Sequence, residues 1–168
     1  MINKRILHLS DLHGVLKTLW KVVHSGQAFD WIVLTGDIAP THVKYMTIDP
    51  KTGNRIIDRE AEAKHQLEWA TNALKPLLDR IPHKALIILN GNHDFCNYGE
   101  VFSGDRTFTI FKGAASFELD GVKVERIGLP DKFIEHGTQE LLRSMFDLDV
   151  EGMLRRIRRP MRCSIALS

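Results

Sequence analysis

The sequence predicts an α/β fold built on a parallel sheet, and three junctions of one kind support this prediction. At each junction a short apolar run ends in polar residues. An apolar run bounded by turn residues is typical of a buried strand. In open α/β sheets, ligands bind at the carboxyl ends of the strands. The three junctions are Asp11-Leu12-His13, Gly36-Asp37 and Gly91-Asn92-His93-Asp94.

The length and composition favour a single domain over residues 1–168 that is not bound to a membrane. A chain of 168 residues can bury a proper core. The net charge of +2 is too small to select a partner. The N-terminus lacks an apolar leader, and no apolar run approaches the roughly 18 residues of a membrane span. The two cysteines, Cys96 and Cys163, are far apart, which favours a reducing compartment, and we expect a cytoplasmic protein.

Residues 5–37 predict a βαβ unit. Apolar runs at 5–10 and 31–35 are expected to be strands, and residues 15–24 have the apolar spacing of a helix. Two strands joined by a helix within about 30 residues form a parallel pair. His8 lies inside the first strand, and we expect it to pack in the core.

Residues 40–58 interrupt this alternation as an excursion. Two runs, at 45–49 and 54–58, flank a polar link with a proline and a glycine, which indicates a hairpin or a long excursion. From 59 to 78, apolar residues spaced by three or four predict a helix. Pro76 is expected to kink or shorten this helix.

The second half of the chain contains further predicted elements. Asp120-Gly121, between two alternating runs, is a strong local signal for a hairpin. Ile127–Pro130 closes that hairpin. The other elements are a strand at 84–89, a loop at 95–106, the hairpin at 116–125, and helices at 137–146 and 150–158.

The polar residues at the strand ends form a candidate metal site. Residues two apart in an extended strand point to the same side, so Asp11 and His13 can aim at one point. Carboxylate, imidazole and amide donors together suit Mn, Fe(II) or Zn. Asp37 follows the neighbouring strand and could bridge two ions. Two ions about 3.5–4 Å apart activate a water and stabilise a phosphoryl group during in-line displacement.

This ordered set of motifs resembles the calcineurin-like metallophosphoesterases, whose motifs begin D-x-H, G-D and G-N-H-[DE]. The resemblance implies a phosphoesterase sandwich of mixed sheets flanked by helices. It also implies metal-dependent hydrolysis of a phosphate mono- or diester, in which a metal-bound hydroxide attacks phosphorus. The family uses two divalent ions, and we expect one or two here, with manganese, iron or zinc as the metal.

The resemblance assigns four metal ligands by position. Asp11 and His13 would bind the first metal, and Asp37 would bridge both. Asn92 would bind the second metal. The oligomeric state stays open.

The resemblance also assigns two catalytic residues. His93 would face the scissile phosphate and protonate the leaving oxygen. Asp94 would orient the His93 ring, as carboxylates do for a working imidazole.

The chain departs from the family pattern after the third motif. The later lone histidine and the final G-H-x-H motif are missing, and His136 is the only histidine after His93. His136 is expected to be a surface residue. The second metal would then have two protein ligands, whereas protein zinc sites usually have at least three. The atypical basic tail at 155–168 is expected to be the solvated side of a helix rather than a site for nucleic acid.

Three explanations stay open for this departure. The chain is a truncated or frameshifted version of a longer enzyme, a natural short form, or a degenerate relative. A degenerate relative would act as a non-catalytic metal-binding or interaction domain. A nuclease or a cyclic-nucleotide phosphodiesterase is a further alternative, with nucleic acid as a possible substrate.

Overall fold

The chain divides into two units, residues 1–111 and residues 112–168. The computed structural model describes residues 3–111, 116–125 and 138–158. The first unit contains all three polar junctions that the sequence singles out.

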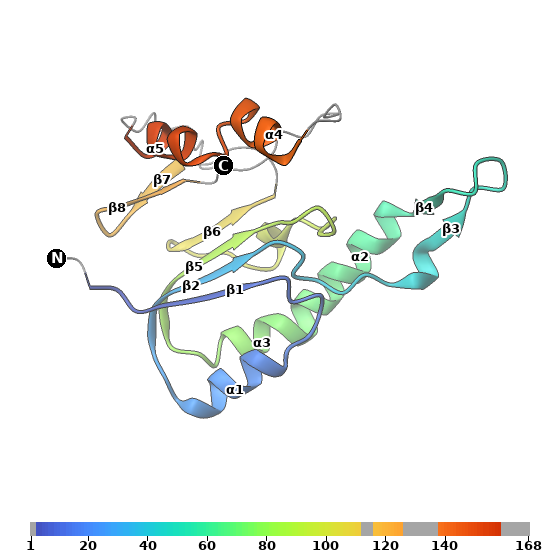
Figure 1. The fold of residues 1–168 in the computed structure, drawn as a ribbon. Coiled ribbons are helices and arrows are strands. Elements are labelled where there is room, and N and C mark those ends of the chain that lie inside the picture. Colours follow the sequence, from blue (N-terminus) through green and yellow to red (C-terminus); the bar gives the residue numbers. More distant parts are fainter. Residues whose placement is uncertain (1–2, 112–115, 126–137, 159–168) are drawn as a thin grey trace. The chain divides into compact units, whose positions relative to one another are not determined.

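A four-stranded parallel sheet forms the centre of the first unit (Figure 1), which confirms the predicted α/β fold. Its strand order is β1-β2-β5-β6, and every neighbouring pair is parallel. The three predicted strands are present with bounds shifted by one or two residues. The strands are β1 Ile6–Ser10, β2 Phe29–Thr35, β5 His83–Leu89 and β6 Thr107–Ile110.

Strand β6 does not appear among the sequence predictions. It has four residues and pairs with β5, where Leu86 lies opposite Thr107 and Leu89 opposite Ile110. A run this short gives little periodicity to detect. The strand forms because its backbone groups pair with those of β5.

Helices cover one face of the sheet. Figure 1 shows α1 (Lys17–Ser25) and α3 (Lys75–Leu78) along the same face. Alternate residues of the strands point toward these helices, as the two-residue period of a strand requires. Side chains of this core that are buried include Leu19, Ile32, Leu34, Leu74, Leu86 and Ile88.

The predicted helix over 59–78 is interrupted before Pro76. It consists of α2 (Arg59–Trp69), a π-helical turn η2 (Ala70–Leu74) and α3. Proline lacks an N–H donor, and its ring clashes with the carbonyl four residues earlier, so a regular α-helix is disfavoured there. The expected effect of Pro76 is confirmed. None of the described helices has the length and apolar character needed to cross a membrane.

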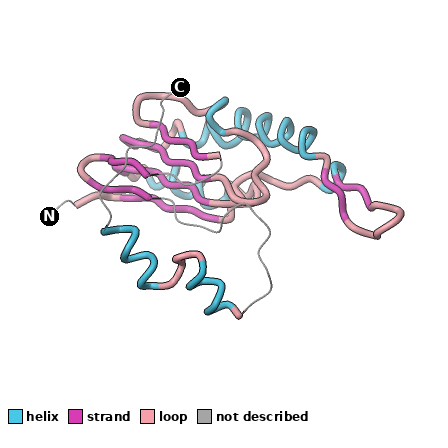
Figure 2. Tube along the Cα trace, turned by 90° about the horizontal axis from the view of Figure 1, so that it is seen from above, coloured by secondary structure: helices cyan, strands magenta, loops and turns pink. Residues whose placement is uncertain are grey.

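The excursion at 40–58 contains the predicted hairpin. A 3₁₀ turn η1 (Val43–Tyr45) precedes the antiparallel pair β3 (Met46–Ile48) and β4 (Arg55–Ile57). Both views show this hairpin projecting beyond the sheet, at the start of α2 (Figures 1 and 2).

The second unit also follows the sequence predictions where it is described. Strands β7 (Ser116–Leu119) and β8 (Val122–Glu125) form the predicted hairpin. Asp120 and Gly121 both have positive φ, at 53° and 75°, as a two-residue type I′ turn requires. The two predicted helices of this unit are α4 (Gln139–Met145) and α5 (Val150–Arg158). In the first unit, a short 3₁₀ turn, η3 (Tyr98–Glu100), lies between β5 and β6. The predictions for Ile127–Pro130, His136, Cys163 and the tail beyond Arg158 lie outside the described residues.

The prediction that His8 packs in the core is wrong. Strand β1 is at the edge of the sheet, and His8 points away from the face that carries Leu7 and Leu9. The His8 side chain is exposed, with its Nε2 atom 2.8 Å from the Thr35 Oγ1 atom.

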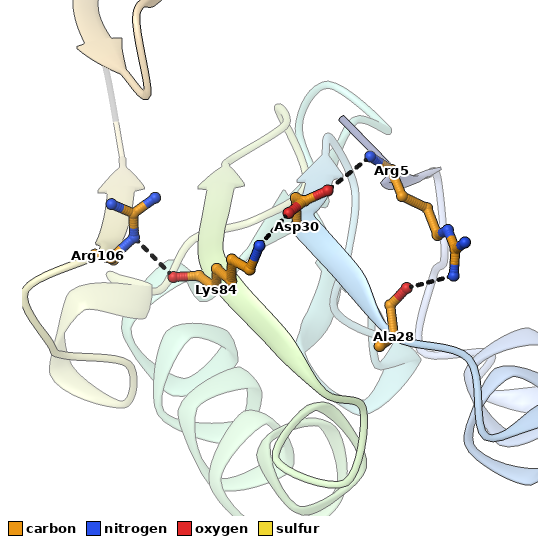
Figure 3. Close-up of polar contacts among 5 residues, drawn as sticks. All are labelled: Arg5, Ala28, Asp30, Lys84 and Arg106. Atoms are coloured by element: carbon orange, nitrogen blue, oxygen red, sulfur yellow. Dashed lines mark hydrogen bonds and ion pairs between the residues drawn. The ribbon is translucent and has the colours of Figure 1, made fainter. Parts of the chain in front are cut away.

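Polar contacts tie together the amino ends of the strands, opposite the edge that carries the three motifs (Figure 3). The Lys84 ammonium lies 2.7 Å from the Asp30 carboxylate, which also accepts the Arg5 N–H at 2.9 Å. These two hydrogen bonds lower the pKa of Asp30, the Lys84 contact most. The Arg5 guanidinium donates to the Ala28 carbonyl, and Arg106 Nε donates to the Lys84 carbonyl. Asp30 therefore has a structural role at the amino end of β2.

Truncation of a buried strand residue should destabilise the first unit. Ile88 is fully buried, and we expect Ile88→Ala to lower the free energy of unfolding by about 2–5 kcal/mol. Val43 is 76% exposed, so Val43→Ala should change it by less than about 0.5 kcal/mol. Urea unfolding followed by circular dichroism measures both. Equal losses would contradict the described core.

Candidate metal centre

The loops after β1 and β2 run side by side at the carboxyl edge of the sheet. The strands are in register up to their last residues, where Ser10 lies opposite Thr35. Beyond them, the Asp11 N–H donates to the Gly36 carbonyl at 3.1 Å, and the His13 N–H donates to the Asp37 carbonyl at 2.8 Å. Backbone pairing thus continues past the sheet and brings the first two motifs together.

Three predicted ligands converge at this edge. One ligand atom from each of Asp11, His13 and Asp37 lies within 4.8 Å of the other two. Asp11 and His13 are exposed and Asp37 is half-buried, so an ion can reach all three. Two carboxylates and an imidazole form a donor set that fits Mn, Fe(II) or Zn.

The backbone at these three residues is in an unfavourable conformation. Asp11, His13 and Asp37 have φ values of 52°, 44° and 45°. Residues other than glycine rarely adopt positive φ, although Asp and His do so more often than most. Such conformations cost on the order of 1–3 kcal/mol each and cluster at functional sites. The loops therefore hold strain at the three side chains that converge.

The loop after β5 packs directly against Asp37 through Gly91. A Cβ atom on Gly91 would lie 2.2 Å from the Asp37 backbone nitrogen and 2.3 Å from its Oδ1 atom. Only glycine permits this approach. The next contact is the His93 N–H, which donates to the Asp37 Oδ1 atom at 3.0 Å.

His93 and Asn92 occupy different positions relative to the three converging side chains. His93 is half-buried, and its ring centroid lies 6.4 Å from that of His13. Asn92 is exposed, and its amide makes no hydrogen bond within the described part of the chain. The structure therefore brings His93 to the site and leaves the Asn92 side chain in solvent next to it.

Asp94 is buried and accepts hydrogen bonds from two loops. Its carboxylate accepts the N–H groups of Ile38 at 2.9 Å and Ala39 at 3.0 Å, in the loop after β2. It also accepts the Gly91 N–H at 2.9 Å and the Tyr98 hydroxyl at 3.0 Å. One carboxylate thus joins the loop that carries Asp37 to the loop that carries His93.

This placement differs from the expectation that Asp94 orients the His93 ring. Among the described residues, the hydrogen bonds of the Asp94 carboxylate go to backbone N–H groups and to Tyr98. Buried backbone N–H groups need an acceptor, and here they donate to the oxygen atoms of the Asp94 carboxylate. The contact of Asp94 is with the loops rather than with the imidazole.

Two residues of the site were missed by the sequence predictions, Glu62 and Gln66. Both are fully buried on α2, one helical turn apart. Glu62 accepts the His42 N–H at 3.1 Å, in the loop after β2. Gln66 holds the loop after β5 through its amide. The sequence signal is spacing alone, because positions 62 and 66 stand at four-residue intervals before the apolar Ala70 and Leu74 of the predicted helix.

The Cys96 thiol and the Tyr98 hydroxyl beneath the loops remain protonated. Burial, and then the Asp94 charge, raises the pKa of the Cys96 thiol to about 12. The same causes raise the pKa of the Tyr98 hydroxyl above its usual range. Both groups are therefore neutral at physiological pH, and Tyr98 acts as a donor to Asp94.

Comparison with known proteins identifies the family. The profile of the calcineurin-like phosphoesterases matches residues 4–164. The chain therefore belongs to the calcineurin-like phosphoesterase family, a family of metal-dependent enzymes that act on phosphate esters. The converging Asp11, His13 and Asp37 side chains agree with this assignment.

Part of the chain is also similar to short regions of several 1-deoxy-D-xylulose-5-phosphate synthases. It is 50% identical over 54 residues to a 1-deoxy-D-xylulose-5-phosphate synthase of Dehalococcoides mccartyi, covering 32% of this chain and 8% of the synthase. It is 53% identical over 58 residues to 1-deoxy-D-xylulose-5-phosphate synthase 2 of Geobacter sulfurreducens, covering 34% and 9%. For the synthase of Aquifex aeolicus the identity is 33% over 72 residues, covering 39% and 12%. The chain thus spans only a small part of these relatives, and no solved structure matches it significantly.

Replacement of the Asp94 carboxylate should destabilise the protein. In Asp94→Asn an amide NH₂ would face buried N–H donors, so we expect a loss of about 2–4 kcal/mol in the free energy of unfolding. Tyr98→Phe removes one donor and leaves the backbone contacts, and should cost only about 1–2 kcal/mol. Chemical denaturation measures both. A loss in Asp94→Asn no greater than in Tyr98→Phe would contradict the joining role of Asp94.

The Cys96 thiol should resist alkylation in the native protein. It is 1% exposed, and its raised pKa, about 12, leaves almost no thiolate at pH values near 8. We expect iodoacetamide to label Cys96 only after unfolding in urea, as measured by peptide mass spectrometry. A Glu100→Cys variant, with an exposed thiol nearby, provides the control and should be labelled at once. Equally fast labelling of native Cys96 would show that the loop opens.

Proposed function

We propose that this protein hydrolyses a phosphate mono- or diester at the carboxyl edge of its parallel sheet. The observation that carries the proposal is the convergence of Asp11, His13 and Asp37 within 4.8 Å on strained backbone. Such strain persists only where the surrounding structure imposes it. The family assignment supports the same chemistry.

In this proposal the three converging side chains hold a divalent ion, with Asp37 available to bridge to a second one. The ion supplies Lewis-acid activation of water and neutralises charge on the phosphoryl group. Asn92 would add an amide oxygen for the second ion, since it is exposed beside His93. Manganese, iron and zinc all fit the donor set, and manganese is the metal we propose to test first.

His93 acts in the proposal as the acid that protonates the leaving oxygen. Its ring lies 6.4 Å from the His13 ring, so both can face one bound phosphate ester. Asp94 supports this function indirectly, by holding the loops that carry Asp37 and His93. The proposed location is the cytoplasm, which rests on the low cysteine content.

The alternative is a metal-binding domain without catalysis. The observation that favours it is the ligand count among the described residues, where Asp11, His13 and Asp37 form a single converging set. Two protein ligands, Asp37 and Asn92, would be a weak set for a second ion.

Hydrolysis of p-nitrophenyl phosphate and of bis(p-nitrophenyl) phosphate tests the proposal. Wild type should hydrolyse at least one ester with added Mn²⁺, lose activity with a chelator, and regain it with metal. Asp37→Asn should lower the rate at least about 100-fold, equivalent to about 2.7 kcal/mol in the barrier. Asp30→Asn is the matched control, since Asp30 lies at the opposite end of β2, and it should retain activity.

Metal analysis of the same samples separates the two candidates. If wild type is as inactive as Asp37→Asn with every metal, the enzyme proposal fails. Bound metal without turnover would then support the non-catalytic alternative, and the absence of metal would contradict both. The preferred ester also tests the nuclease and phosphodiesterase alternative, which requires hydrolysis of the diester.

A further inference from the structure

We propose that Gln66 is a positioning residue for His93, an inference that rests on the proposed function. The Gln66 side chain is fully buried, and within the described part of the chain every hydrogen bond of its amide goes to the loop after β5. Its Nε2 group donates to the His93 carbonyl at 2.8 Å. Its Oε1 atom accepts the N–H groups of Phe95 at 2.7 Å and Cys96 at 3.3 Å.

These contacts fix the backbone of His93 on both sides of its Cα atom. On one side, the His93 N–H donates to the Asp37 Oδ1 atom at 3.0 Å. On the other side, the His93 carbonyl accepts from Gln66. With both flanking peptide groups held, the direction of the Cα–Cβ bond is set, and only the two side-chain torsions of the ring remain free.

The two anchors differ in what they are attached to. Asp37 belongs to the converging ligand set, so its bond places His93 relative to the proposed metal. Gln66 belongs to α2, which packs on the core through Ala63 and Leu67. Gln66 therefore holds His93 from the scaffold side, and its loss should free the carbonyl end of that residue.

Two further contacts restrict the site loops, one in the loop after β5 and one in the loop after β2. The Asn90 Nδ2 group donates to the Cys96 carbonyl at 2.8 Å, and Glu62, one turn before Gln66, accepts the His42 N–H. The Asn90, Asp94 and Asp37 side chains still hold the loop after β5 without Gln66, so we expect the defect to be confined mainly to the position of the His93 ring.

This confinement predicts a specific kinetic signature. A displaced acid matters most for a leaving group that needs a proton, and general acid catalysis is worth about 10²–10⁴-fold. A p-nitrophenolate leaves without one, whereas a phenolate is far more basic and needs protonation. Loss of Gln66 should therefore affect phenyl esters more than p-nitrophenyl esters.

The experiment compares kcat/KM for the two esters in the class, mono- or diester, that wild type hydrolyses. Gln66→Met has a similar shape and lacks hydrogen bonds. We expect it to lose about 10–100-fold on the phenyl ester and less than about 3-fold on the p-nitrophenyl ester. Gln66→Asn keeps an amide on a shorter side chain and should show the same selectivity to a smaller degree, which preserves the test if the Met variant folds poorly.

The controls separate positioning from stability. Gln27→Met makes the same change at an exposed position and should leave both rates unchanged. His93→Asn should show the same selectivity as Gln66→Met. In the double variant the Gln66 change should add no further loss, because residues that act through one group are not additive.

Each outcome has a distinct meaning. Equal losses on both esters, or additive losses in the double variant, would overturn the positioning role while leaving the proposed function intact. A wild type that hydrolyses neither ester would overturn the proposed function and this inference together.

Discussion

The buried carboxylate of Asp94 is the contact on which the candidate site depends. It accepts backbone N–H groups from the loop after β2 and from the loop after β5. Those loops carry Asp37 and His93. A buried carboxylate without donors would be costly, and so would buried N–H groups without an acceptor. The buried carboxylate and the buried N–H groups therefore stabilise each other, and this favours the observed arrangement of the two loops.

Helix α2 connects the site loops to the core through buried polar side chains. Glu62 and Gln66 are polar residues on the buried side of a helix, where apolar residues would ordinarily lie. Each satisfies backbone groups of one site loop. Residues 36–42 and 90–97 of these loops lie outside helices and strands, so their peptide groups depend on such side chains. Buried polar residues thus transmit the rigidity of the core to the site.

Much of the first unit could be predicted from the sequence because its signals are local. The runs that form β1, β2 and β5 are apolar and bounded by turn residues, and Pro76 interrupts its helix for a reason internal to proline. The convergence of Asp11, His13 and Asp37 also followed, since parallel strands end at one edge. Strand β6 could not be predicted, because four residues become a strand only when β5 is there to pair with them.

The sequence by itself determined which residue types stand at the strand ends, and hence the chemistry available there. Only the tertiary structure decided the distant partners: Ile38 and Ala39 for Asp94, and the loop after β5 for Gln66. A hydrogen bond between distant segments has no periodicity in the sequence, and it forms wherever folding leaves a buried donor beside an acceptor.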